Sequence, residues 1–182
     1  MTIIETAEKK LQEVRKFLAD MRDQEQRAFG DKEPFDHYLS AFLTAGMSVR
    51  GAFHVKQDRL RNEAIKNWKK AGEAQLTPAQ KCIYDFMQED RNCEVHDRGS
   101  HRVVGTKEIK VGVGGTYSDK SGTLTAMGSP SVLLGADTGV TIYAPQYSFD
   151  MFGVKRPVTE VCAEYLHLLE QMVAHYKANA SN

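Results

Sequence analysis

Apolar residues recur every three or four positions through four long stretches of the chain, and this spacing predicts amphipathic helices. The first stretch is the clearest, because its apolar residues alternate in steps of three and four from Ile4 to Met21. The third begins at Thr77-Pro78-Ala79-Gln80, which combines a capping threonine, a proline at the first helical position and a capping box. In the second, Gly46 and Gly51 indicate close packing against a neighbouring helix. The predicted helices span residues 2–29, 34–56, 78–98 and 156–178.

A fifth and shorter helical stretch, residues 58–71, is strongly basic. Residues 55–71 carry six basic and two acidic side chains, a local charge of +4. A solvated helix face is the simpler interpretation, and a patch that contacts the phosphates of RNA is the functional one. The candidate RNA-binding residues are Arg59, Arg61, Lys66, Lys69 and Lys70.

The pattern changes after Gly99, where short runs of valine, threonine and isoleucine are separated by glycines. Residues 102–147 hold eight of the fourteen glycines, and 119–122 is typical of a hairpin tip. The expected strands are 103–104, 109–111, 123–125, 132–134 and 140–143. Isolated hairpins are marginally stable, so this part should pack on the helices or on a second subunit.

These elements predict a single, mainly α domain over residues 1–182. Its helical bundle comprises residues 1–100 and 154–182, and a small antiparallel β-rich insertion, residues 101–153, precedes the last helix.

Charge and cysteine content narrow the class of protein. Twenty-four basic and 24 acidic residues give a formal net charge of zero, so binding to nucleic acid or membranes through bulk charge is not expected. No apolar run approaches the ~20 residues of a membrane span, and the first residues turn charged without a signal-peptide core. The three cysteines are odd in number and lack C-x-x-C spacing. We therefore expect reduced thiols and a cytoplasmic location.

No cofactor or metal is predicted. The glycines at 112–115 lead into no helix and lack the lysine of a phosphate-binding loop. His96, His101 and Cys93 match no standard zinc spacing, and Cys93 is interpreted as a structural thiol.

The stretch with the most chemical information is Asp90-Arg91-Asn92-Cys93-Glu94-Val95-His96, at the end of the capped helix. Asn92 and His96 are one turn apart, so in a regular helix they share a face. Arg91 lies about 140° from His96 around the axis and flanks this pair unless the helix loosens near Gly99. Cationic side chains are favoured at this end of a helix by its dipole.

Arg91-Asn92-x-x-x-His96 resembles the signature of the HEPN family, in which four to six residues, often beginning with a polar one, separate an arginine from a histidine. The order of predicted helices agrees with the HEPN bundle, and the β-rich insertion departs from it. The resemblance implies a metal-independent endoribonuclease, commonly a homodimer whose two motifs share one cleft. It also implies a toxin or phage-defence setting, with an antitoxin or another protein as partner.

The implied reaction is attack of an RNA 2′-hydroxyl on the adjacent phosphate. Histidine exchanges protons near neutral pH, and arginine offers a forked donor to phosphoryl oxygens. The catalytic candidates are therefore His96 as general acid and base, Arg91 as phosphate stabiliser and Asn92 as an orienting group.

Two alternatives remain open. The chain could be a non-catalytic HEPN-like module that binds a nucleotide or a protein, or a purely structural dimer. An enzyme needs both Arg91 and His96 at an accessible cleft. A structural dimer would bury them or pair Arg91 with an acidic neighbour, Asp90, Glu94 or Glu89.

Overall fold

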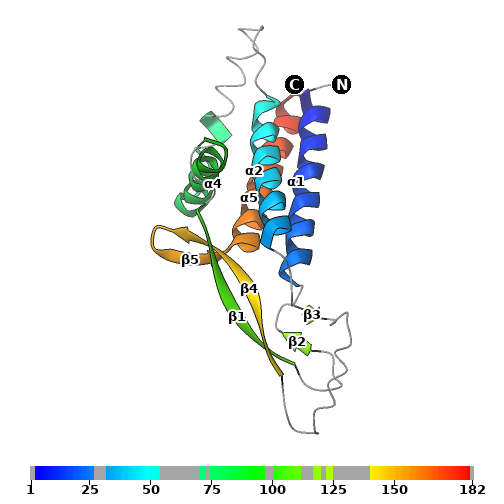
Figure 1. The fold of residues 1–182 in the computed structure, drawn as a ribbon. Coiled ribbons are helices and arrows are strands. Elements are labelled where there is room, and N and C mark those ends of the chain that lie inside the picture. Colours follow the sequence, from blue (N-terminus) through cyan, green and yellow to red (C-terminus); the bar gives the residue numbers. More distant parts are fainter. Residues whose placement is uncertain are drawn as a thin grey trace.

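The protein is mainly helical and carries a small antiparallel sheet, as the hydrophobic pattern predicts (Figure 1). The computed structural model describes residues 3–26, 32–53, 70–72, 74–96, 101–111, 117–119, 122–124 and 140–180. The described helices are α1 (Ile3–Glu25), α2 (Lys32–Gly51), α4 (Pro78–His96) and α5 (Val158–Ala180). The strands are β1 (Arg102–Val111), β2 (Tyr117–Asp119), β3 (Gly122–Leu124), β4 (Val140–Met151) and β5 (Val154–Pro157).

The helices α1, α2 and α5 run side by side, and α4 packs against α2 and α5 (Figure 1). The apolar residues that recur every three or four positions form the buried face of α1, and those of the last predicted helix form the buried face of α5. From α1 the core receives Ala7, Leu11, Val14, Leu18 and Met21. Among the described helices, none combines the length and apolar character needed to cross a membrane.

The predicted start of α4 is confirmed in atomic detail. The backbone N–H of Thr77 donates to the Gln80 side chain at 2.9 Å, and the backbone N–H of Gln80 donates to the Thr77 hydroxyl at 3.3 Å. Pro78 is the first residue of the helix, where its missing N–H is harmless. This reciprocal cap fixes where α4 begins and therefore which residues fall in its last turns.

The sheet has the order β1-β4-β5, with antiparallel neighbours. Strand β1 joins two short predicted strands into one that pairs with β4 from Arg102↔Phe149 to Val111↔Val140. The predicted hairpin tip is confirmed by the pairing of Asp119 with Gly122 between β2 and β3.

Two parts of the predicted β-rich insertion need separate comment. The predicted strand at 132–134 lies outside the described residues. Strand β4 is longer than the predicted strand 140–143 and extends to Met151. Strand β5 then pairs with β4 and ends at Pro157, in a part of the chain that the sequence analysis assigned to the helical bundle. The short turn at Phe152-Gly153 allows this hairpin, because both residues have positive φ angles, 55° and 83°.

Aromatic side chains of β4 attach the sheet to the helices, so the expected packing of the insertion is observed at this end. Tyr147 stacks on Phe35 of α2 with ring centroids 3.6 Å apart. Phe149 meets the Phe86 ring of α4 edge-on at 5.1 Å. Both β4 residues are buried and two positions apart, so they lie on the same face of the strand.

Gly46 and Gly51 differ in what a side chain would meet, so alanine substitution should separate them. A Cβ atom at Gly46 would lie 2.8 Å from Cε1 of the buried Tyr165, whereas at Gly51 no atom of the described residues lies within 4 Å. The predicted close packing is therefore right for Gly46 and wrong for Gly51, which ends α2. We expect Gly46→Ala to lower the free energy of unfolding by about 1–3 kcal/mol. Gly51→Ala should change it by less than ~1 kcal/mol. Urea unfolding of both variants measures the difference, and equal effects would contradict the packing at Gly46.

Tyr165 should make the protein sensitive to alkaline pH. Burial raises the pKa of this phenol from 10.0 to about 12, partly opposed by the nearby charge of Arg50. The hydroxyl forms no hydrogen bond with a described residue. The phenol therefore loses its proton at a lower pH in the unfolded chain than in the folded chain. The free energy of unfolding should then fall by up to about 1.4 kcal/mol per pH unit between the two pKa values.

Tyr165→Phe isolates this contribution, because other groups also titrate at high pH. At pH 7 the variant should unfold within ~1 kcal/mol of the unmodified protein, since the hydroxyl lacks a close partner. Above pH 10.0 its stability should decline less steeply. If the free energy of unfolding fell equally with pH in the two proteins, the burial of this phenol would be contradicted.

Candidate functional site

The Arg91-x4-His96 motif occupies the last turns of α4. The helix is held in place by its inward face, where Ile83 and Met87 are buried in the core. Its backbone remains helical through His96, so Asn92 and His96 keep the one-turn separation that the sequence predicts. The side chain of His96 lies outside the described part of the structure.

Arg91 and Asn92 differ in exposure and contact each other. Arg91 is half-buried and Asn92 is exposed. Nη1 of Arg91 donates to Oδ1 of Asn92 at 3.4 Å, a long and weak hydrogen bond. The buried Nε atom of Arg91 has no hydrogen-bond partner among the described residues. No ion pair joins Arg91 to another side chain that the structure describes, so the pairing with Glu89 considered from the sequence is not formed. The side chain of Glu94, another partner considered, lies outside the described part of the structure.

Four of the five predicted RNA-binding residues lie outside the described part of the structure. These are Arg59, Arg61, Lys66 and Lys69. Lys70 is exposed. The short segment that contains it precedes α4 in the chain (Figure 1). Because Pro78 and Arg91 are about 20 Å apart along the helix axis, α4 leads away from the segment that holds Lys70.

The structure adds Asp90 to Cys93 and His101, two residues that the sequence analysis considered together only as metal ligands. The buried carboxylate of Asp90 accepts the backbone N–H of His101 and lies 3.1 Å from its ring Nδ1. The other ring nitrogen, Nε2, lies 3.9 Å from Sγ of Cys93. One sequence signal existed for this cluster, because Asp90 follows Ile83 and Met87 at the spacing of the core-facing stripe. A carboxylate at such a position requires a polar partner.

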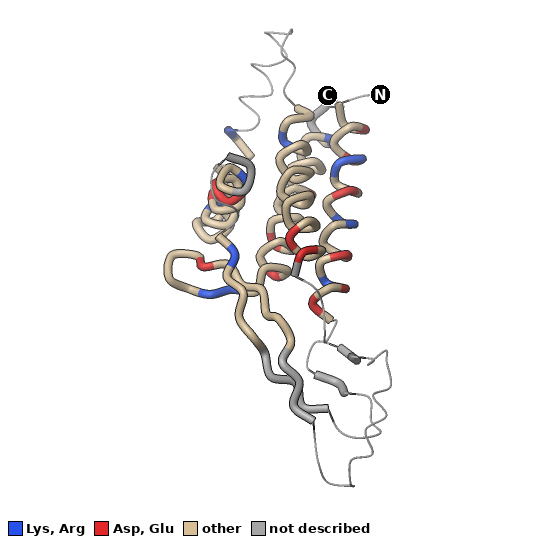
Figure 2. The backbone as a smooth tube through the Cα atoms, viewed as in Figure 1, with Lys and Arg blue, Asp and Glu red and all other residues tan. Residues whose placement is uncertain are grey.

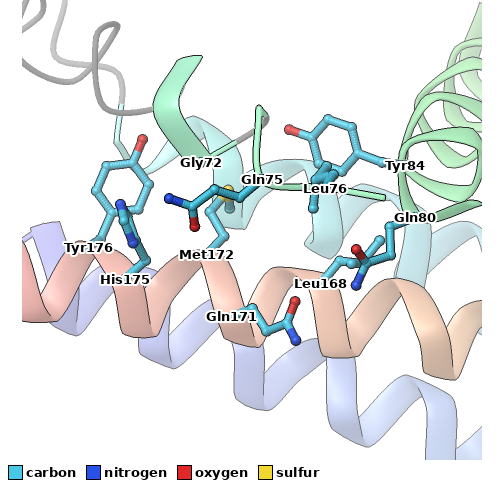
Figure 3. A pocket seen from close by; sticks show the side chains of 10 residues that line it. All are labelled: Gly72, Gln75, Leu76, Gln80, Tyr84, Leu168, Gln171, Met172, His175 and Tyr176. Carbon is cyan, nitrogen blue, oxygen red and sulfur yellow. The ribbon is translucent and has the colours of Figure 1, made fainter. Parts of the chain in front are cut away.

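A cavity of about 400 Å³ lies near the opposite end of α4, between the segment at 72–76, the start of α4 and the second half of α5 (Figure 3). The lining combines three glutamine amides with histidine and tyrosine rings. These residues are Gln75, Gln80, Gln171, His175, Tyr84 and Tyr176. The cavity is large enough for a small ligand, and its lining includes none of the motif residues.

Charge is mixed on the described helices. In Figure 2, basic and acidic positions both occur along the length of α1. Within the described ranges, no group of three histidine, cysteine or acidic side chains is placed to hold a metal ion.

Fold and motif together define a mainly helical protein with a three-stranded antiparallel sheet and an arginine in the last turns of α4. Neither a family model, nor a curated protein, nor a solved structure matches this chain. Its function is therefore inferred from its own residues.

Proposed function

We propose that the protein is a metal-independent endoribonuclease of HEPN type. His96 acts as general acid and base, Arg91 stabilises the charge on the scissile phosphate, and Asn92 orients the reacting groups. The 2′-hydroxyl of RNA attacks the adjacent phosphorus atom, and the 5′-oxygen of the next nucleotide leaves. The products are a 2′,3′-cyclic phosphate and a free 5′-hydroxyl.

The observation that carries this proposal is the state of Arg91. Arg91 is half-buried, its Nε has no hydrogen-bond partner among the described residues, and the hydrogen bond that its Nη1 makes to Asn92 is long, at 3.4 Å. Arginine in an ordinary structural role is normally neutralised by a carboxylate or fully solvated. A bound phosphate would satisfy the open donors of Arg91 through paired hydrogen bonds.

The position of Arg91 and Asn92 also supports the proposal. Both residues lie on a helix that is fixed at its start by a capping box and along its length by core packing. Catalytic groups act effectively when a rigid element holds them. The C-terminal end of α4 also stabilises positive charge, which suits Arg91 and the protonated form of His96.

The proposed working form is a homodimer in which two motifs face one cleft, located in the cytoplasm. RNA phosphates outside the scissile bond are bound by the basic stretch that contains Lys70. A toxin or phage-defence setting, with an antitoxin or another protein as regulator, follows from the same resemblance.

The experiment that tests this function uses the chemistry of the 2′-hydroxyl. We expect the protein to cut a fluorescent RNA in EDTA and to leave products with 2′,3′-cyclic phosphate ends. The same oligonucleotide with deoxyribose at the cleavage site should remain intact, because the attacking group is missing. Cleavage of the deoxy-substituted oligonucleotide, or cleavage that EDTA abolishes, would contradict the mechanism.

A second candidate function is that of a non-catalytic binding module, and the cavity at the start of α4 favours it. Amide groups and aromatic rings bind an uncharged heterocycle such as a nucleobase better than they bind phosphate. If RNA stays intact under all conditions, calorimetric titration with nucleosides is the discriminating measurement. Binding that Gln171→Ala and His175→Ala both weaken would then favour the module.

A further inference from the structure

Cys93, His101 and Asp90 form a linked set of thiol, imidazole and carboxylate at the junction of α4 and β1. Sγ of Cys93 is 3.9 Å from Nε2 of His101, and Nδ1 of His101 is 3.1 Å from Oδ1 of Asp90. A nucleophile, a base and a group that orients the base, in this order, is the general arrangement of an activated nucleophile. We propose that Cys93 is a nucleophilic thiol that accepts an acyl group from a thioester or an activated ester.

His101 is held in one place by both its backbone and its ring. Its backbone N–H donates to Asp90, and its carbonyl accepts the backbone N–H of Asp150 at 3.4 Å. The Phe86 ring packs beside the imidazole, with centroids 5.9 Å apart. The backbone contacts fix the position of His101, and a ring that turned away from Cys93 would lose its contact with Asp90.

The contact with Asp90 determines which ring nitrogen carries the proton. An ionised carboxylate can only accept hydrogen bonds, so Nδ1 of neutral His101 is the protonated nitrogen. Nε2 then presents a lone pair toward the Cys93 thiol. Asp90 has no exposed surface, so water weakens its interaction with His101 little.

The thiol and the base are both open to a reagent. Cys93 is half-buried, and the His101 side chain is 42% exposed. The same helix carries Cys82, which is also half-buried and has no histidine partner in the described part of the chain. Cys82 is therefore an internal reference for a thiol without a base.

The proposed step is balanced within the site and its substrate. Nε2 of His101 takes the thiol proton, and Sγ of Cys93 attacks the carbonyl carbon of the acyl donor. The carbon–sulfur or carbon–oxygen bond to the leaving group breaks, and His101 returns the proton to that group. The products are an S-acyl cysteine and a free thiol or alcohol, and no oxidant or reductant is needed.

The test compares two thiols in one molecule. The full-length protein is treated at pH 7 with limiting iodoacetamide, and the modification of Cys93 and Cys82 is followed by peptide mass spectrometry. We expect Cys93 to react about tenfold faster than Cys82. His101→Gln should lower the Cys93 rate to near that of Cys82, and Asp90→Asn should lower it in part. A merely structural role of Asp90 would instead raise both rates by loosening the fold.

Acyl transfer is tested with p-nitrophenyl acetate as the donor. We expect a burst of one equivalent of p-nitrophenolate and an acetyl group on Cys93, both absent in Cys93→Ser. Equal rates for the two cysteines, or a Cys93 rate unchanged in His101→Gln, would overturn the proposal. Acetylation confined to other residues would overturn the acyl specificity. None of these readouts depends on RNA cleavage, so this inference can fail or succeed independently of the ribonuclease function.

Discussion

His96→Ala is expected to lower the rate of RNA cleavage by about 10²–10⁴-fold, the usual effect of removing a general acid or base. Arg91→Ala is expected to lower it by about 10²–10³-fold, because charge that builds on the phosphoryl oxygens loses its positioned donor. Arg91→Lys should recover only part of this loss, since an ammonium group keeps the charge but lacks the planar fork. Single-turnover cleavage of a fluorescent RNA in EDTA measures all three rates.

Arg15→Ala is the matched control for Arg91→Ala. It also removes one guanidinium from a helix, but Arg15 lies on α1, is 52% exposed and contacts Glu170 at 2.8 Å. Its cleavage rate should equal that of the unmodified protein. Circular dichroism and light scattering of each variant verify the fold and the oligomeric state. If Arg91→Ala and His96→Ala cleave RNA as fast as Arg15→Ala, the proposed site is wrong.

Tyr147→Ala is expected to lower the free energy of unfolding by about 3–5 kcal/mol, which is a large part of the stability of a typical domain. The Tyr147 side chain is 1% exposed and stacks on Phe35 with the rings nearly parallel, at an angle of 3°. It also lies 5.7 Å beneath the guanidinium of Arg102, which donates to Asp36 at 2.7 Å. Removing the ring leaves a cavity between the sheet and α2. It also removes the packing of the ring against the guanidinium of this ion pair.

Phe152→Ala is the control from the same hairpin. Phe152 is 80% exposed at the turn between β4 and β5, so its loss should change stability by less than ~0.5 kcal/mol. Urea titration monitored by fluorescence and by circular dichroism gives both values. A Tyr147→Ala effect no larger than that of Phe152→Ala would show that the sheet contributes little to the stability of the helical core.

The motif itself was accessible from the sequence, but its surroundings were not. Arg91, Asn92 and His96 are close in the chain, and the helical repeat fixes their relative positions. The sequence analysis interpreted Cys93 as a structural thiol, whereas in the structure its Sγ lies 3.9 Å from the ring of His101, eight residues away and beyond the end of α4. Only the path of the chain after the helix brings that ring back to Asp90 and Cys93.

The sequence by itself determined the elements whose signals are local. The stripe from Ala7 to Met21 specifies the buried face of α1, and Thr77 and Gln80 specify the start of α4. These signals involve residues three or four positions apart, whose geometry is the same in every α-helix.

The tertiary structure alone decided which distant residues meet. The pairing of Val111 with Val140, the stacking of Tyr147 on Phe35 and the contact of Asp90 with His101 have no counterpart in local periodicity. Many registers and packings satisfy the same apolar pattern, and the choice among them depends on shape and polar contacts across the whole core. The bundle could therefore be predicted from the sequence, whereas the attachment of the sheet and the thiol–imidazole–carboxylate cluster required the folded chain.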